Sequence, residues 1–198
     1  MKLFYTEKSQ YARIVRVAII ELNLADRVEL QQVTVRDRNS ELLNYNPTGK
    51  VPSLATDDGF ILSETRIIVS YLNHLNPEIK IVADNADGFS QQLEGITTAF
   101  IDGISTWTRE RLFRSEGEQS PKVIELERSR ALRILGYFEK ISDKLDQTPK
   151  LAHITLASAL GLEIRLPELQ WRQNYPQLAR WYDEFSERPS LQVTKPDS

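Results

Sequence analysis

The sequence contains no cysteine, and that absence excludes several kinds of chemistry. Thiolate zinc sites, iron–sulfur clusters, disulfide bonds and a cysteine nucleophile all require this residue. Histidine is nearly as rare, because His74 and His153 are the only two and lie far apart in the chain. A histidine-rich metal centre is therefore not expected, and we predict no metal cofactor.

The chain also lacks an apolar run near the length of about 20 residues that a membrane span needs, and the apolar stretch among its first residues is too short for a signal peptide. The net charge of −3 and the pI near 5.6 argue against nucleic acid or an anionic membrane as a partner. What is present is ordinary for a globular protein, with 198 residues, 40% of them hydrophobic and 27% charged. We expect a cytoplasmic protein with one or two domains.

The first 80 residues carry the periodicities of a mixed α/β domain. Runs of apolar or β-branched residues at 2–5 and 28–35 predict strands, and an apolar stripe from Tyr11 to Leu22 predicts a helix between them, with Ser9 as its N-cap. Three further elements follow: a short helix near 39–44, a hairpin of 51–55 and 60–62 around Asp57-Asp58-Gly59, and a helix at 65–76 that buries Ile67, Ile68, Tyr71, Leu72 and Leu75. This order of elements, βαβαββα, is that of a thioredoxin-like fold.

After residue 88 the strand patterns give way to helical ones, at roughly 89–115, 121–146, 154–166 and 175–187. The segment before them has neither periodicity. We therefore predict three parts: a thioredoxin-like domain at 1–79, a linker at 80–88 and an all-helical domain at 89–198.

A thioredoxin-like oxidoreductase needs Cys-x-x-Cys after its first strand, and this chain has TEKSQ at residues 6–10 instead. Its motifs resemble those of the glutathione S-transferase superfamily: SQYAR at 9–13, NPTGKVPSL at 46–54 and SETRII at 63–68, with LARWY at 178–182 similar to bacterial members. The resemblance, to a serine-type member, covers almost the whole chain. It implies glutathione as co-substrate, a small electrophile as second substrate and a homodimer.

The resemblance gives four residues roles in binding glutathione. It implies a cis peptide bond at Val51-Pro52, which turns the Val51 N–H and C=O toward the cysteinyl backbone of glutathione like an added strand. Glu64 would accept from the γ-glutamyl ammonium, and Thr65 would hold the carboxylate at a helix N-terminus. Lys50 would reach the cysteinyl-glycine end. The plainer alternatives are a proline at a strand start, a helix cap and a solvated lysine.

The nucleophile would be the thiol of glutathione, whose pKa of about 8.5 falls when a hydrogen-bond donor and a helix N-terminus stabilise the thiolate. By resemblance Ser9 is the first candidate for this donor, although Gln10 stands where the family has proline. Tyr5 and Thr6 remain competing candidates. For Tyr5, a buried core aromatic is the alternative interpretation.

In the helical domain the resemblance places Trp107 and Arg111, four residues apart on one helix face, beside the second-substrate pocket. A core tryptophan and a solvated arginine are the plainer interpretations. Thr155 is expected to cap the helix over 154–166, with Ser158 where the family usually has an acidic capping partner.

These features predict a glutathione transferase with a role in detoxification, in which the glutathione thiolate attacks an electrophilic carbon. A glutathione-dependent isomerase, ether-cleaving or dehalogenating relative would use the same binding site and is the alternative enzyme. A non-catalytic relative that serves as a protein-interaction module is the alternative of another class, and the departure at Gln10 keeps it open.

Overall fold

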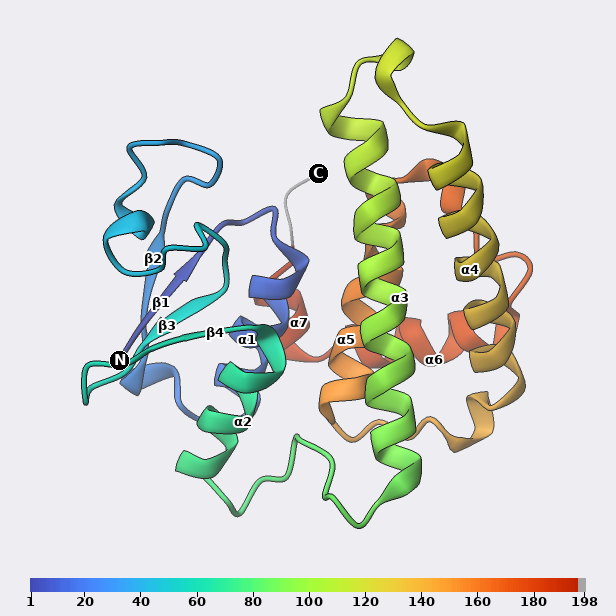
Figure 1. Cartoon of the computed structure of the whole chain (residues 1–198). Helices are drawn as coiled ribbons and strands as arrows, with labels where there is room; N and C mark the ends of the chain where they lie inside the picture. Colours follow the sequence, from blue (N-terminus) through green and yellow to red (C-terminus); the bar gives the residue numbers. More distant parts are fainter. Residues whose placement is uncertain (196–198) are drawn as a thin grey trace. The chain divides into compact units, whose positions relative to one another are not determined.

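The structure, a computed structural model, describes residues 1–195 (Figure 1). Met1–Val82 and residues 189–195 form one compact unit, and Ala83–Arg188 form a second. The division differs from the predicted limits of 1–79, 80–88 and 89–198 at the C-terminal end, where 189–195 belong with the first unit. Residues 196–198 of the predicted helical domain lie outside the described residues.

The first unit contains a four-stranded sheet in the order β2-β1-β3-β4. Its strands are β1 (Lys2–Tyr5), β2 (Glu29–Gln32), β3 (Ser53–Ala55) and β4 (Ile61–Ser63). β1 runs parallel to β2 and antiparallel to β3, and β3 forms the predicted hairpin with β4. Gly59 has a φ of +89° in that hairpin, a backbone conformation that glycine adopts without a steric cost. The thioredoxin-like order of elements is confirmed, although β2 is shorter than the predicted 28–35.

Two α-helices follow the strands as predicted, α1 (Gln10–Glu21) after β1 and α2 (Thr65–Leu75) after β4, and they pack against each other. The other elements are two 3-10 turns, η1 (Ala25–Arg27) and η2 (Glu41–Asn44). The predicted buried face of α2 is wrong at Ile67, which is 55% exposed. Val69 is buried in its place, because Ile68, Val69 and Leu72 share the face that packs inward.

The short helix α7 (Pro189–Val193) returns the chain to the first unit by packing against α1. The Arg13 guanidinium donates to the Leu191 carbonyl at 3.1 Å, and the Ser190 hydroxyl bonds the Glu21 carboxylate at 2.5 Å. Arg13 and Ser190 are both buried, so these bonds fasten α7 to α1 from the inside.

The second unit consists of helices α3 (Gly88–Phe113), α4 (Pro121–Lys140), α5 (Leu151–Leu160) and α6 (Pro176–Ser186), with the 3-10 turns η3 (Glu116–Glu118), η4 (Ser142–Lys144), η5 (Gly161–Ile164) and η6 (Pro167–Leu169). The long helix α3 packs along both α4 and α5 (Figure 1). The predicted start of α5 is wrong, because it begins at Leu151 and Thr155 lies inside it rather than at its cap. Every residue of α5 is buried, so packing around the helix decides where it begins.

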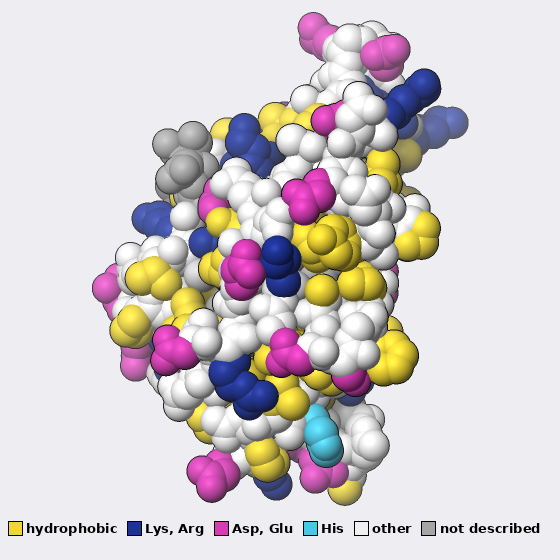
Figure 2. Space-filling model, turned by 90° about the vertical axis from the view of Figure 1, so that its left-hand side faces the viewer, with side chains coloured by type: hydrophobic (Ala, Val, Ile, Leu, Met, Phe, Trp, Pro, Cys, Tyr) yellow, Lys and Arg dark blue, Asp and Glu magenta, His cyan; other side chains and the backbone are white. Residues whose placement is uncertain are grey.

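The face of the molecule shown in Figure 2 carries acidic and basic side chains interspersed with hydrophobic ones. Over residues 1–195, no helix combines the length and the apolar character needed to cross a membrane. The same residues contain no group of three or more His, Cys, Asp or Glu side chains arranged to hold a metal ion.

Candidate functional site

The strand register gathers the predicted site segments at one edge of the sheet. Phe4 of β1 pairs with Ser53 of β3, and Ser53 pairs with Ser63 of β4. In each case the pair is the last one at that end of the ladder, so the chain beyond it continues from the same edge. Three segments adjoin this edge: residues 6–9 after β1, residues 51–52 before β3 and residues 64–65 after β4.

Ser9 is the N-cap of α1, as predicted. Its Oγ accepts a hydrogen bond from the Ala12 N–H at 3.2 Å. A serine hydroxyl can accept and donate at once, so this bond leaves the hydroxyl hydrogen available to an acceptor. Because the hydroxyl lies at the first turn of a 12-residue helix, the local dipole and the free N–H groups favour a negative charge beside it.

Tyr5, the competing candidate on β1, has other partners. Burial and a hydrogen bond to the Glu7 carboxylate raise the pKa of the Tyr5 phenol. The Arg16 guanidinium lies 4.6 Å from the centroid of the Tyr5 ring and pairs with Glu7 at 2.9 Å. A phenol that donates to a carboxylate is a poor donor for a thiolate, which favours Ser9 over Tyr5.

Thr6 and Gln10 flank the serine. The Thr6 carbonyl accepts from the Ser9 N–H at 3.1 Å and so shapes the turn before α1. Gln10 occupies the first helical position and is buried, with its Oε1 lacking a hydrogen-bond partner among the described residues. The sequence departure at this position therefore places a polar side chain inside the first unit, where it costs desolvation free energy.

The Val51-Pro52 peptide bond is cis, which confirms the expectation. Within residues 1–195 neither the N–H nor the C=O of Val51 makes a hydrogen bond, so both backbone groups are available to a ligand. Lys50, next to it, is exposed, and its ammonium has no partner in that part of the chain.

Glu64 holds a backbone conformation that side-chain-bearing residues rarely adopt, with φ 71° and ψ 126°. Its carbonyl accepts from the Ile68 N–H at 3.0 Å and starts α2, but its side chain makes no capping bond. The carboxylate is exposed and has no partner within the described range. The N–H and hydroxyl of Thr65, which is half-buried, also lack a partner there. Backbone strain of about 1–3 kcal/mol clusters at binding sites, where other contacts enforce it.

The two residues predicted beside the second-substrate pocket both lie on α3. Trp107 is only 1% exposed and belongs to the core of the second unit. Arg111 is held by two neighbours, an ion pair to Glu168 at 3.0 Å and a hydrogen bond to the Gln119 side-chain oxygen at 2.8 Å. In this structure the tryptophan packs α3 and the arginine fastens its C-terminal end to η6.

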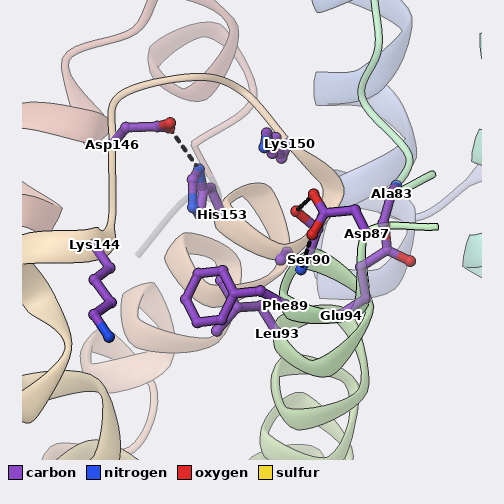
Figure 3. A pocket seen from close by; sticks show the side chains of 11 residues that line it. Ala83, Asp87, Phe89, Ser90, Leu93, Glu94, Lys144, Asp146, Lys150 and His153 are labelled. Carbon is purple, nitrogen blue, oxygen red and sulfur yellow. Dashed lines mark hydrogen bonds and ion pairs between the residues drawn. The ribbon is translucent and has the colours of Figure 1, made fainter. Parts of the chain in front are cut away.

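A pocket of about 180 Å³ lies in the second unit, near the starts of α3 and α5 (Figure 3). Lys144, Lys150 and His153 contribute basic groups to its wall. The wall's carboxylates, from Asp87, Glu94 and Asp146, each accept from a backbone N–H at 2.6–3.0 Å. These carboxylates therefore fasten the loops and helix starts around the pocket.

His153 is the buried centre of that wall. Its Nδ1–H donates to the Thr148 carbonyl at 2.7 Å and lies 3.6 Å from the Asp146 carboxylate. The rings of Trp181 and Phe185 meet the imidazole edge to face. Burial lowers the pKa of His153, against a smaller opposite effect of the Thr148 carbonyl and Asp146. A neutral imidazole thus holds the loop before α5.

Comparison with known proteins gives the same family along the chain. The family model described as "Glutathione S-transferase, N-terminal domain" matches residues 3–80. The crystal structure of a glutathione transferase family member from Pseudomonas fluorescens Pf-5, with bound glutathione, is 31% identical, covers 100% of this chain and 99% of its own, and superposes with a TM-score of 0.91.

Two curated relatives differ in the class of protein they name. The uncharacterized GST-like protein YibF of Escherichia coli K12 is 26% identical, over 99% of this chain and 98% of its own length. Human elongation factor 1-gamma is 28% identical over 79% of this chain, and the match spans 36% of its length.

Proposed function

The chain belongs to the glutathione transferase family, and from this premise we propose that its first unit binds glutathione and activates the thiol for attack on a small electrophile. One observation carries the proposal. At one edge of the sheet, the backbone of Val51, the Glu64 carboxylate and the Thr65 hydroxyl all lack partners among the described residues. Polar groups left unpaired together are what a polar ligand requires.

Each part of glutathione has a complementary group in this arrangement. The γ-glutamyl ammonium is a donor for the exposed Glu64 carboxylate, and its carboxylate is an acceptor for the Thr65 hydroxyl and N–H at the start of α2. The cysteinyl backbone pairs with the N–H and C=O of Val51 as an added strand would. Lys50 supplies a cation for the glycyl carboxylate.

Ser9 is the residue we assign to the thiol. Its hydroxyl donates to the sulfur, while the first turn of α1 favours the negative charge, so the thiol proton leaves to solvent more readily. The thiolate sulfur then attacks the electrophilic carbon and forms the thioether bond, while the bond from that carbon to its leaving group, halide in an aromatic halide, breaks and the halide departs with the electron pair.

For the second substrate we propose the helical unit. Trp107 supports α3 from within, and Arg111 is the cation that an electrophile with an acidic group would meet, in competition with Glu168. The electrophile itself is small and apolar or aromatic by family resemblance.

We further propose a cytoplasmic homodimer that acts in detoxification. Phe60 and Ile67 are exposed apolar side chains of the first unit. Exposed apolar surface often marks a site that another protein covers, and this supports the proposal that a second copy of the chain covers it in solution. Light scattering on the purified chain tests it, and a monomeric mass at micromolar concentration would contradict the dimer.

The test of the function combines binding and turnover. The chain should be retained on immobilised glutathione and released by free glutathione, and it should conjugate glutathione to a generic aromatic halide. Ser9→Ala should lower kcat/KM about 10- to 100-fold, the effect of losing a hydrogen bond to a charged group, with a much smaller change in glutathione affinity. Ser9→Thr keeps both the cap and the hydroxyl and is the matched control. Unchanged turnover in Ser9→Ala would remove Ser9 from the mechanism.

A non-catalytic interaction module is the second candidate, and the match to elongation factor 1-gamma favours it. It predicts retention on glutathione without turnover of any electrophile in a broad panel. Under that outcome, Ser9→Ala and the unaltered chain would be equal in every turnover assay.

A further inference from the structure

A buried triangle of hydrogen bonds supports the loop between η2 and β3. Asn46 is 3% exposed and Ser53 is fully buried. The Asn46 Nδ2 donates to the Ser53 Oγ at 2.7 Å, and the Ser53 hydroxyl donates to the Lys50 carbonyl at 2.8 Å. Asn46 Nδ2 also lies 3.4 Å from that carbonyl. The Thr48 N–H donates to the Asn46 side-chain oxygen at 2.9 Å, which fixes the orientation of the amide.

The triangle is itself anchored to the fold. The Asn46 N–H donates to the Leu42 carbonyl of η2 at 2.8 Å, and the Asn46 carbonyl accepts from the Gly49 N–H at 3.0 Å. Gly49 has a φ of +60°, and a Cβ there would lie 3.2 Å from the Leu43 side chain. Ser53 belongs to β3. The two side chains of the triangle, those of Asn46 and Ser53, are therefore held in place before any ligand binds.

The two donors converge on the carbonyl of the peptide group that joins Lys50 to Val51. This peptide group is trans, because the cis bond of the loop is the next one. A trans peptide group is planar, and its N–H points in the opposite direction to its C=O. A Lys50 carbonyl turned toward Asn46 and Ser53 consequently turns the Val51 N–H away from them, and this N–H has no partner within residues 1–195.

We propose that Asn46 and Ser53 are positioning residues of the glutathione site, which aim the Val51 N–H at the cysteinyl carbonyl through the Lys50 carbonyl. This inference rests on the proposed function. Both side chains act from the far side of the peptide group. The peptide is thus oriented during folding, and binding is spared the entropy of ordering it.

The test measures glutathione affinity and one amide signal. Ser53→Ala removes the hydroxyl with little change in volume and should raise the glutathione Kd roughly 3- to 10-fold by calorimetry, as expected for one neutral hydrogen bond. In ¹H–¹⁵N spectra of the full chain, the Val51 amide should shift strongly when glutathione is added to the unaltered protein and less in Ser53→Ala. A role in stability alone would lower Tm and leave both the Kd and the shift unchanged.

Thr56→Val is the matched control. The Thr56 hydroxyl also lies in the hairpin of β3 and β4 and donates to a backbone carbonyl, that of Phe60, at 3.2 Å. Its removal should lower Tm with less than a twofold change in glutathione Kd. An equal loss of affinity in Thr56→Val and Ser53→Ala would overturn the proposal.

Asn46→Asp is the second variant, for the case that Ser53→Ala does not fold. Its carboxylate still accepts from the Thr48 N–H, but it accepts from the Ser53 hydroxyl as well and withdraws that donor from Lys50. Affinity should fall at least as far as in Ser53→Ala. Unaltered affinity in a folded variant of either residue overturns the positioning role alone. No binding of glutathione by the unaltered chain overturns the proposed function, and this inference with it.

Discussion

Glu64 in the first unit and Glu110 in the second hold their carboxylates in opposite settings, one exposed and one buried. At the sheet edge of the first unit, the Val51 backbone, the Glu64 carboxylate and Thr65 have no partner among the described residues, and the backbone at Glu64 is strained. In the second unit the buried Glu110 carboxylate is bonded internally: it accepts from the Ser120 N–H at 2.9 Å and pairs with Arg114 at 2.8 Å. The same residue type, glutamate, thus has an exposed carboxylate without a described partner in one unit and a buried, bonded carboxylate in the other.

The largest expected effect concerns binding in the first unit. Glu64→Ala should weaken glutathione binding by about 1.5–3 kcal/mol, because a hydrogen bond between charged groups is lost. Its thermal stability should hardly change, since the exposed carboxylate supports no other described residue. Calorimetric titration and a melting curve on the same sample test both halves. Thr65→Ser keeps the hydroxyl and should stay within about threefold of the original affinity. An unchanged Kd in Glu64→Ala would contradict the assigned site.

The opposite pattern is expected for Glu110 in the second unit. Glu110→Ala leaves the Ser120 N–H at the start of α4 without its acceptor and should cost about 1–3 kcal/mol of the free energy of unfolding. Glutathione affinity should be retained. Urea denaturation measures the loss, and Glu125→Ala on the exposed side of α4 is the control, with an expected change below about 0.5 kcal/mol. If Glu110→Ala lost glutathione affinity without losing stability, the expected difference between Glu64 and Glu110 would be contradicted.

A smaller effect, on the free energy of unfolding, is expected from the backbone conformation of Glu64. Glu64→Gly should be about 0.5–1 kcal/mol more stable than Glu64→Ala, because glycine adopts a φ near 71° without a steric penalty. Both variants should bind glutathione equally poorly. Paired urea denaturation curves decide, and equal stability of the two would mean that the backbone there stores no strain.

The pH dependence of stability is expected to come from the second unit. The pKa of His153 is lowered by burial, so the folded state binds its proton less readily than the unfolded chain, whose histidine pKa is about 6.5. The stability from neutral His153 is complete above that value and is lost as the pH falls below it toward the folded pKa. His153→Gln should flatten this part of the curve relative to the unaltered chain. His74→Gln, at the exposed second histidine, should leave it as it was.

Local patterns predicted the elements of the first unit well, because each one is marked by its own residues. Each signal lies within a few positions of the sequence. Examples are the apolar stripe of α1, the serine before it and the Asp-Asp-Gly turn. The candidate site residues were proposed from short motifs beside strand ends, whose roles follow from the family resemblance, and these roles stay predictions. The bonds from Asn46 and Ser53 that orient the Lys50 carbonyl, and the backbone conformation of Glu64, were not predicted, since no local pattern encodes them.

The features that were predicted wrongly or not at all share a physical cause, which is that they depend on packing rather than on a local sequence signal. Ile67 fits the apolar face of α2 by spacing, yet it is exposed, because the neighbours of the helix determine which side is covered. Helix α5 begins at Leu151 without a side-chain cap, so its sequence held no start signal to find. The return of α7 to α1 rests on two bonds, from Arg13 to Leu191 across 178 positions and from Ser190 to Glu21 across 169, and no periodicity encodes such pairings.

That return has a consequence for the order in which the protein is made. The segment that completes the first unit leaves the ribosome only after Ala83–Arg188 have been synthesised, which takes roughly 5–20 s at ~5–20 residues per second. During this interval the carbonyl acceptor for the Arg13 guanidinium and the hydroxyl partner of Glu21 do not yet exist. Until α7 is made, the face of α1 that packs against it stays uncovered. In the order of synthesis, the first unit is therefore begun before the second and completed only after it.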